Sequence, residues 1–353
     1  MTRSVRIDID LNAIRHNYSL AKTLSGTRAF AVVKSNAYGH GAVAVAKALA
    51  EADGFAVVTT AEALELRDAG IAAPILVLQG PQSAQEFVQY QHHRLMPVLH
   101  QPDQVAWLEE QSNLDVLDVW LKVDTGMGRL GVSMEEASQL LSTKTPLWHG
   151  VLTHFACADD PGNTHTQQQI SRFQQLLAKH KLNTSLANSA GIMAWPESHQ
   201  GWSRPGIMLY GANPLLTELP DKCHLKPAMR VCAPVIAVKQ LAKGSGVGYS
   251  QTYICERDMR VGYIGIGYGD GLPRVLNPTA TVRLKDIECP IIGRVSMDSI
   301  AVDLSALDGR SVTVGDWATL WGPDHPVELM AKAAGTISYE IVTGIRGNPN
   351  YLE

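Results

Sequence analysis

The sequence predicts an α/β protein: a (β/α)8 barrel of the TIM type followed by a mostly β domain. From about residue 26 to residue 225, short apolar runs alternate with longer amphipathic stretches, a pattern typical of repeated βα units and a parallel sheet. After about residue 226, Val- and Ile-rich runs are separated by Gly and Pro, with little helical periodicity. With 353 residues, 45% of them hydrophobic, the chain is long enough for one large and one smaller domain.

The barrel is predicted from eight apolar runs of strand length, with amphipathic stretches between them. The candidate strands are residues 29–33, 54–58, 75–78, 96–99, 116–123, 150–153, 184–187 and 206–209. Helices are expected, for example, over residues 43–52, 60–69, 102–110, 134–141 and 166–179. Eight strands alternating with helices are the number that closes a barrel of this type.

The second domain is predicted from the change of pattern alone. It places residues 1–225 in the barrel and residues 226–353 in the β domain, in which one helical stretch is expected over 327–334. Residues 1–10 alternate polar and apolar side chains, as a strand does, and this strand could pair with either domain. No internal repeat is found.

The bulk properties point to a small substrate. A formal charge of -4 leaves no basic footprint for nucleic acid or an anionic membrane, and no run of 18 apolar residues is present. The N-terminus has no apolar signal region, so we expect a cytoplasmic protein. The five cysteines are widely spaced and form no C-x-x-C pair, which argues against disulfides and a structural zinc site, and no metal is expected.

Lys34 is the most informative residue. It follows the apolar run 29–33 and precedes a turn of small residues. A buried ammonium loses charge, and the free amine condenses with aldehydes, including that of pyridoxal phosphate, to give Schiff bases. A lone lysine at a strand end more often reaches back to solvent, so the neighbouring residues decide between the two interpretations.

Polar residues follow the other candidate strands in the same way. In a barrel, the carboxyl ends of the strands meet at one face, where active sites form. We therefore expect these segments to form one site; they are Tyr38 with Lys34, DTGMGRLG at 124–131, HFACAD at 154–159, ANSA at 187–190 and SRPGI at 203–207.

The segment VVKSNAYGHG at 32–41 closely resembles the cofactor-lysine motif of the alanine racemases, and the other segments follow in that family's order. The resemblance implies that Lys34 holds pyridoxal 5'-phosphate covalently and acts as one catalytic base. It further implies that His154 lies against the cofactor ring and that Arg204 faces the ring nitrogen. The phosphate would be held by hydroxyls and backbone N–H groups of Tyr38, Ser189, Gly206, Ile207 and Tyr339.

Of the residues in these motifs, Arg204 says most about the reaction mechanism. A guanidinium only donates and stays protonated, so a ring nitrogen facing it stays unprotonated. The weaker electron sink would suppress transamination and decarboxylation. Arg129 matches the family arginine near the cofactor phenol and the substrate carboxylate. Lys122 matches a lysine that family members can carry as a carbamate, which would orient Arg129.

Tyr249 lies in GVGYSQTY at 246–253, which resembles the family motif for the second catalytic base. Racemisation removes a proton from one face of Cα and delivers one to the other, and the family supplies this tyrosine from the β domain of a partner subunit. Ionising a free phenol at pH 7 costs about 4 kcal/mol. A hydrogen-bonded chain from Tyr249 through His154 to Arg204 would lower that cost. The resemblance thus implies a homodimer with composite sites.

Three further motifs complete the resemblance. Met297 would offer its backbone N–H to the substrate carboxylate, with Asp298 in support, and Tyr339 would narrow the pocket towards a methyl side chain. Small departures at Ser35 and Ser296 should be tolerated, whereas the end of the chain differs from the usual finish, which leaves its contacts open. The residues that would line the entrance are Tyr268, Arg274, Arg294, Asp159 and Ile337.

The sequence thus predicts a racemase interconverting L- and D-alanine, for D-alanine supply to a cell wall or for D-alanine breakdown. A racemase of broader specificity, for example for serine, stays open, because pocket width depends on backbone placement. A non-catalytic pyridoxal-phosphate-binding protein is the alternative from another class. Such proteins have the barrel without the β domain, so the segment after residue 226 argues against it.

Overall fold

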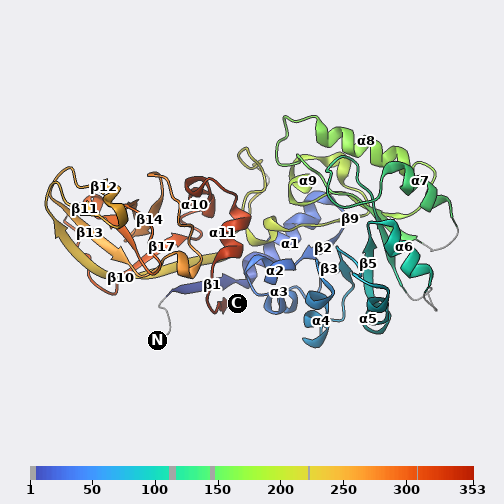
Figure 1. The fold of residues 1–353 in the computed structure, drawn as a ribbon, viewed down its shortest axis with the longest axis horizontal. Helices are drawn as coiled ribbons and strands as arrows, with labels where there is room; N and C mark the ends of the chain where they lie inside the picture. The colour runs from blue at the N-terminus through green and yellow to red at the C-terminus, as the bar shows by residue number, and fades with distance from the viewer. Residues whose placement is uncertain (1–4, 111–116, 144–147, 222, 308) are drawn as a thin grey trace.

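The fold consists of a parallel barrel and a mostly antiparallel β-sheet domain. The computed structural model describes residues 5–110, 117–143, 148–221, 223–307 and 309–353. Figure 1 shows the barrel, coloured blue to green, at one end of the molecule and the β domain, coloured orange, at the other. Within the described part of the chain, no helix is long and apolar enough to cross a membrane.

The barrel is built from eight parallel strands in the order β8-β7-β6-β5-β4-β3-β2-β9. The barrel closes between β8 and β9. There, just beyond the ends of the two strands, the backbone N–H of Arg204 donates to the carbonyl of Ala187. The strands are β2 (Arg28–Val32), β3 (Gly54–Val57), β4 (Ile75–Val77), β5 (Leu95–Leu99), β6 (Val119–Lys122), β7 (Trp148–Leu152), β8 (Asn183–Ser185) and β9 (Trp202–Ser203). The predicted strand 116–123 begins at a residue outside the described ranges.

Helices connect these strands at the positions that the amphipathic stretches predict. Two of them begin with reciprocal capping boxes, Thr59 with Glu62 and Ser133 with Glu136, which satisfy backbone N–H groups of the first turn. The helices are α1 (Leu11–Ser25), α2 (Lys34–Tyr38), α3 (Ala42–Ala48), α4 (Thr60–Asp68), α5 (Phe87–His93), α6 (Pro102–Glu109), α7 (Met134–Ser142), α8 (His165–Leu177) and α9 (Ser189–Ala194), with 3₁₀ turns η1 (Ala84–Glu86), η3 (Pro196–Ser198) and η4 (Ile207–Tyr210).

The prediction of a strand over residues 206–209 was wrong. The last barrel strand is β9 (Trp202–Ser203), and the apolar run that follows it forms η4 (Ile207–Tyr210), whose four residues are all buried. A short run that is buried on every side shows neither strand nor helix periodicity, so its sequence does not separate the two. The backbone leaves the strand direction at Gly206, where φ is -114° and ψ is -97°.

Aromatic rings fill the barrel interior beneath the strand ends. Phe30 stacks on Trp202 with ring centroids 4.1 Å apart and meets Trp120 edge-on at 5.8 Å. Side chains alternate along a strand, so each ring lies two or four residues before an inward-facing residue at the mouth, such as Lys34 or Lys122. This layer of rings lies below the carboxyl ends of the strands, where active sites of such barrels form.

The second sheet has the order β13-β16-β15-β14-β17-β10-β1-β18, so the N-terminal strand joins the β domain. β1 runs antiparallel to β10 and parallel to β18. The strands are β1 (Arg6–Asp10), β10 (Met229–Leu241), β11 (Gly246–Val247), β12 (Tyr253–Ile254), β13 (Met259–Ile264), β14 (Thr281–Leu284), β15 (Ile287–Ile292), β16 (Ile300–Asp303), β17 (Trp317–Trp321) and β18 (Asn350–Leu352). The domain also contains α10 (Val327–Ala334), α11 (Ser338–Gly344), η5 (Tyr249–Gln251), η6 (Tyr268–Asp270) and η7 (Ser305–Leu307).

Candidate active site

A cavity of about 450 Å³ lies at the carboxyl ends of the barrel strands. All eight residues predicted to bind the cofactor line it, together with Arg129 and Lys122. The lining residues are Val32, Lys34, Tyr38, Val58, Leu78, Gln79, Lys122, Arg129, Leu130, Leu152, His154, Asn188, Ser189, Arg204, Gly206, Ile207 and Tyr339.

Lys34 is the candidate nucleophile of this cavity. It stands two residues beyond the end of β2, which is held on one side by β3 and on the other by β9. Burial, followed by the positive charges of Arg129 and Arg204, lowers the pKa of Lys34 below its usual value. These effects favour the neutral amine, the form that attacks an aldehyde carbonyl.

A left-handed turn follows Lys34. The four residues from Ser35 to Tyr38 have φ values of 52° to 53°, although none of them is glycine. Each L-residue in this conformation costs about 1–2 kcal/mol. The carboxylate of Glu62 accepts the N–H of Ser35 at 2.7 Å, and the side chain of Asn36 accepts the N–H of Ala42 at 2.9 Å. Strain of this kind marks a position where the surrounding structure imposes the conformation.

Four residues, Tyr38, Ser189, Gly206 and Met208, meet at the end of this turn in a way that suits a phosphate. The N–H groups of Gly206 and Met208 point at the hydroxyl of Ser189, at 2.9 and 3.3 Å. A Cβ atom at Gly206 would lie only 2.6 Å from the hydroxyl of Tyr38, so this backbone approach needs glycine. Hydroxyl and N–H donors around a small residue are the groups that hold a phosphate.

Ile207 and Tyr339 are the other two residues predicted to hold the phosphate. Ile207 and Tyr339 line the cavity, and the rings of Tyr339 and Tyr38 are 5.9 Å apart. The second N–H that points at Ser189, besides that of Gly206, belongs to Met208. Burial raises the pKa of Tyr339 to about 12, so its hydroxyl stays protonated and able to donate.

Arg204 is buried and held by backbone carbonyls. Its terminal nitrogens donate to the carbonyls of Ser185, Thr153 and Leu186 and to the hydroxyl of Ser185. Among the described residues, none accepts a hydrogen bond from the Nε–H of Arg204. Burial lowers the pKa of Arg204 to about 10, so the side chain stays charged at neutral pH.

His154 is neutral beside these cations. Its pKa falls well below the usual value because of burial and then the charges of Arg204 and Lys122. An imidazole without charge can lie flat on an aromatic ring and can pass a proton between donor and acceptor. The backbone of His154 is bound from α8: the side-chain amide of Gln169 donates to its carbonyl at 3.0 Å.

Four basic residues, Lys34, Lys122, Arg129 and Arg204, line the cavity, and among the described lining residues there is no carboxylate. Burial and the nearby arginines lower the pKa of Lys122 to about 8. The site is therefore built for anions.

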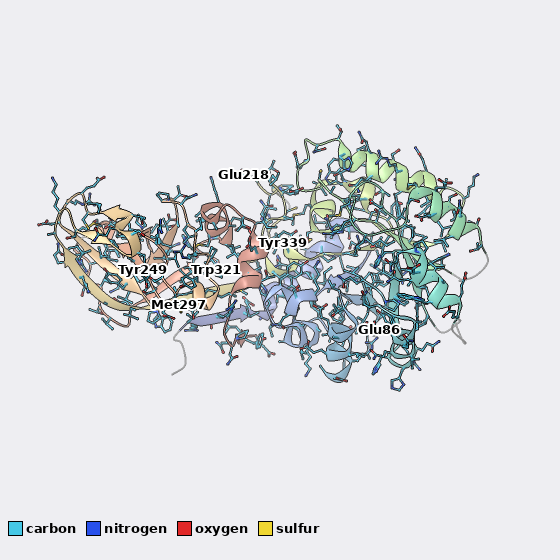
Figure 2. The ribbon with its side chains drawn as sticks, in the orientation of Figure 1. Glu86, Glu218, Tyr249, Met297, Trp321 and Tyr339 are labelled. Carbon is cyan, nitrogen blue, oxygen red and sulfur yellow. The ribbon has the colours of Figure 1, made fainter. Side chains whose placement is uncertain are left out.

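The predicted entrance residues divide between the two domains. Asp159 and Ile337 line a second cavity, of about 790 Å³, which shares Tyr339 and Asn188 with the first. Met297 and Tyr249 lie in the β domain, whereas Tyr339 lies where the two domains meet (Figure 2). The predicted residues that line neither cavity are Tyr249, Tyr268, Arg274, Arg294, Met297 and Asp298.

Contacts within the β domain link the segments that carry several of these residues. The side chain of Arg294 contacts the hydroxyl of Ser250, next to Tyr249, at 3.5 Å. The N–H of Tyr268 donates to the carbonyl of Ser296 at 3.1 Å, which places η6 beside the loop of Met297. Tyr249 is 66% exposed and Met297 51% exposed, so both side chains are accessible on this surface.

Several residues of the site were missed by sequence reasoning. Gln79 lies two residues beyond the end of β4 and lines the cavity, so the same rule of strand ends could have found it. Asp124 accepts three N–H groups of its own loop, from Gly126, Met127 and Gly128, and so shapes the loop that carries Arg129. Gln169 lies in a polar stretch of α8, where nothing in the sequence distinguishes it from its exposed neighbours.

Two family models cover almost the entire chain. Residues 9–214 match "Alanine racemase, N-terminal domain", and residues 228–351 match "Alanine racemase, C-terminal domain". The chain belongs to the alanine racemase family. The alanine racemase of Coxiella burnetii (strain RSA 331 / Henzerling II) is 42% identical over 356 residues, which cover 98% of this chain and 97% of that protein.

Solved alanine racemase structures agree with the fold and the domain arrangement. The biosynthetic alanine racemase of Pseudomonas aeruginosa superposes with a TM-score of 0.92 at 39% identity, covering all of both chains. The alanine racemase of Bartonella henselae, solved with covalently bound pyridoxal phosphate, superposes with a TM-score of 0.88 at 32% identity over 99% of each chain. The predicted family and fold class are thus confirmed.

Proposed function

We propose that this protein is a pyridoxal-phosphate-dependent alanine racemase that interconverts L- and D-alanine. One observation carries the proposal: Lys34, with a lowered pKa, lines the same cavity as the cradle formed by Tyr38, Ser189 and Gly206. A nucleophilic amine and a phosphate site within one cavity are what an aldehyde cofactor with a phosphate requires. The same reaction would serve either biological role, the supply of D-alanine for peptidoglycan or the breakdown of D-alanine.

The cofactor would be held at both ends by residues already in place. Lys34 would bind the aldehyde carbon, and the phosphate would sit among Tyr38, Ser189, Gly206, Ile207 and Tyr339. His154 would lie against the ring, and the Nε–H of Arg204 would face the ring nitrogen. When bound, pyridoxal phosphate supplies the electron-accepting ring that makes the Cα proton of an amino acid acidic.

Two residues would move the protons. Lys34 takes or delivers the proton on one face of Cα, and Tyr249 serves the opposite face. Tyr249 lines neither cavity of its own chain and is exposed, so it would come from the β domain of a second copy. We therefore propose a homodimer with two composite sites, in which the β domain of one subunit, residues 226–353 together with β1, completes the barrel of the other.

The substrate carboxylate would be bound by Arg129 and by the backbone N–H of Met297 of the second copy, with Asp298 in support. Tyr339 would narrow the pocket around a methyl side chain. Asp159 and Ile337 would line the outer entrance from one subunit, and Tyr268, Arg274 and Arg294 would line it from the other.

Lys122 would carry a carbamate. Its lowered pKa favours the neutral amine, which would attack carbon dioxide, form the N–C bond and release one proton. The product is an anion in a cavity lined by three other basic residues, and it would orient Arg129. Intact mass measurement of the native protein tests this; a mass without the added carbon dioxide would remove the carbamate.

We also propose that the enzyme works in the cytoplasm. The thiols of Cys157, Cys232, Cys255 and Cys289 are free, and the last three are buried. A reducing compartment keeps thiols in this state.

The experiment is incubation of the purified protein with pyridoxal phosphate and L-alanine, followed by chiral analysis of the alanine. We expect rapid formation of D-alanine, and a loss of about 10²-fold or more in Tyr249→Phe, since general acid–base catalysis contributes that much. Bound cofactor without D-alanine would contradict the activity and point to other amino acids, such as serine, or to a binding role.

A further inference from the structure

His40 is a buried polar residue that the proposed chemistry does not use. Its side chain is 0% exposed. Its Nδ1 atom lies 2.9 Å from the carbonyl oxygen of Tyr38 and 3.2 Å from that of Ala37. Carbonyl oxygens only accept, so Nδ1 carries the proton. In the described part of the structure, Nε2 is buried without a hydrogen-bond partner.

The two carbonyls that His40 binds belong to the left-handed turn after Lys34. Glu62 binds the first residue of that turn, Ser35, through its N–H, and Asn36 binds forward to Ala42. His40 holds the other end, at Ala37 and Tyr38. Because left-handed backbone is disfavoured for these residues, the turn needs a partner at both ends to persist.

The ring of His40 also supports the side chain of Tyr38. It stacks on Tyr210 with centroids 4.4 Å apart, and Tyr210 packs on Tyr38 at 4.9 Å. Tyr210 is itself fixed by a hydrogen bond of 2.9 Å from its hydroxyl to the carbonyl of Val32. The main chain of Tyr38 is thus held by Nδ1–H, and its ring is held through Tyr210.

The unpartnered Nε2 indicates that the Nδ1–H group is the part of His40 with a structural role. A buried nitrogen without a partner is unfavourable, and an apolar side chain of similar size would avoid it. The feature of imidazole that an apolar side chain cannot supply here is the Nδ1–H donor. That donor acts on the turn that brings the Tyr38 hydroxyl to Gly206, where a Cβ would meet it at 2.6 Å.

We propose that His40 is a positioning residue for the phosphate end of the cofactor: its Nδ1–H locks the left-handed turn, so that the hydroxyl of Tyr38 is presented beside Gly206 and Ser189. This inference rests on the proposed function, because it needs a phosphate in that cradle. It assigns His40 no contact with cofactor or substrate.

The test compares binding of pyridoxal 5'-phosphate with binding of pyridoxal, which lacks the phosphate, to cofactor-free protein followed by absorbance. In His40→Leu, we expect affinity for pyridoxal 5'-phosphate to fall about tenfold, the effect of one well-placed hydrogen bond, while affinity for pyridoxal stays unchanged. In a Tyr38→Phe background, the same substitution should have no further effect on the phosphate compound.

Two amide variants at position 40 separate loss of the hydrogen bond from misfolding. Asparagine places its N–H near the position of Nδ1 and glutamine near that of Nε2, so His40→Asn should keep the wild-type preference for the phosphate and His40→Gln should lose it. Equal losses for both compounds, or identical behaviour of the two amide variants, would overturn the inference. Failure of the wild-type protein to bind pyridoxal 5'-phosphate would instead overturn the proposed function, and this inference with it.

Discussion

Positive charge governs the chemistry of the cavity. Arg204 is 4% exposed and fixed by carbonyls of β8 and of the segment after β7, so its guanidinium cannot turn away from the site. Lys122, 8% exposed, lies close enough to Arg204 and Arg129 for their charges to lower its pKa. For each of these two residues, a substitution has an expected effect that can be measured without the overall rate of racemisation.

Arg204→Glu should change the products. A carboxyl group can share a proton with a ring nitrogen, which strengthens the electron sink, whereas a guanidinium cannot. We expect the yield of pyruvate relative to D-alanine to rise when the variant is given L-alanine. Arg204→Lys keeps the charge and should keep the wild-type ratio. An unchanged ratio in Arg204→Glu would show that Arg204 does not control the outcome.

Lys122→Met should stabilise the cofactor-free protein in buffer without carbon dioxide. The pKa of Lys122 falls from 10.5 to about 8 on folding, so the charged form destabilises the fold fully below pH 8 and ceases to do so as pH rises towards 10.5. We expect a gain in the free energy of unfolding of up to about 3 kcal/mol at pH 7.

Urea denaturation at a series of pH values measures this gain, which should shrink above pH 8. Bicarbonate should also reduce it, because a carbamate removes the positive charge. A gain that is independent of both pH and bicarbonate would mean that the substitution acts through packing.

One face of α8 holds the loops that follow β6 and β7. His165, Gln169 and Arg172 lie four and three residues apart, so they share that face. His165 contacts the carbonyl of Gly126 at 2.8 Å, and Arg172 donates to that of Thr125 at 2.8 Å. Gln169, 0% exposed, binds both loops: it donates to Thr125 and to the carbonyl of His154 and accepts the N–H of Ala156.

Gln169→Leu should loosen both loops together. It leaves the N–H of Ala156 and the carbonyl of His154 without their partner. A fully buried group left in this way costs about 1–3 kcal/mol, and these partly buried groups should cost less. We expect a lower melting temperature and a raised KM for alanine, because the loop of Arg129 is no longer fixed. The neighbouring Gln168 is exposed, so Gln168→Leu is the matched control and should leave both values unchanged. Equal effects of the two variants would refute the role of Gln169.

The two proposed bases lie in different domains of the chain. Lys34 lines the barrel cavity, and Tyr249 belongs to η5 in the β domain, which Figure 2 places away from Tyr339 and the barrel. An arrangement of this kind gives a complete site only when the exposed surface around Tyr249 meets the barrel mouth of another copy.

Complementation between inactive variants tests the composite site. Lys34→Ala and Tyr249→Phe, each inactive as purified, should regain activity when co-expressed, because a mixed dimer has one site with both bases intact. Random pairing gives about a quarter of the wild-type activity. If both bases of a site came from one chain, the mixture would stay as inactive as its parts.

The segments that line the cavity could be predicted because each of them follows a strand of the parallel barrel. Lys34, His154, Ser189 and Arg204 each follow a barrel strand, and parallel strands bring their carboxyl ends to the same mouth. The α/β class, the seven earlier barrel strands and the helix Val327–Ala334 were likewise recognised from apolar runs and helical periodicity. These features depend on residues close together in sequence.

Other features depend on segments that meet only in the folded chain. The run Ile207–Tyr210 is a 3₁₀ turn and not a strand because Ser189 binds the N–H groups at its start. The partners of His40 and Gln169, and the choice of β10 and β18 as neighbours of β1, also follow from packing between distant elements. Local patterns report which side chains avoid water, whereas hydrogen-bond partners are chosen by geometry that arises when the elements assemble.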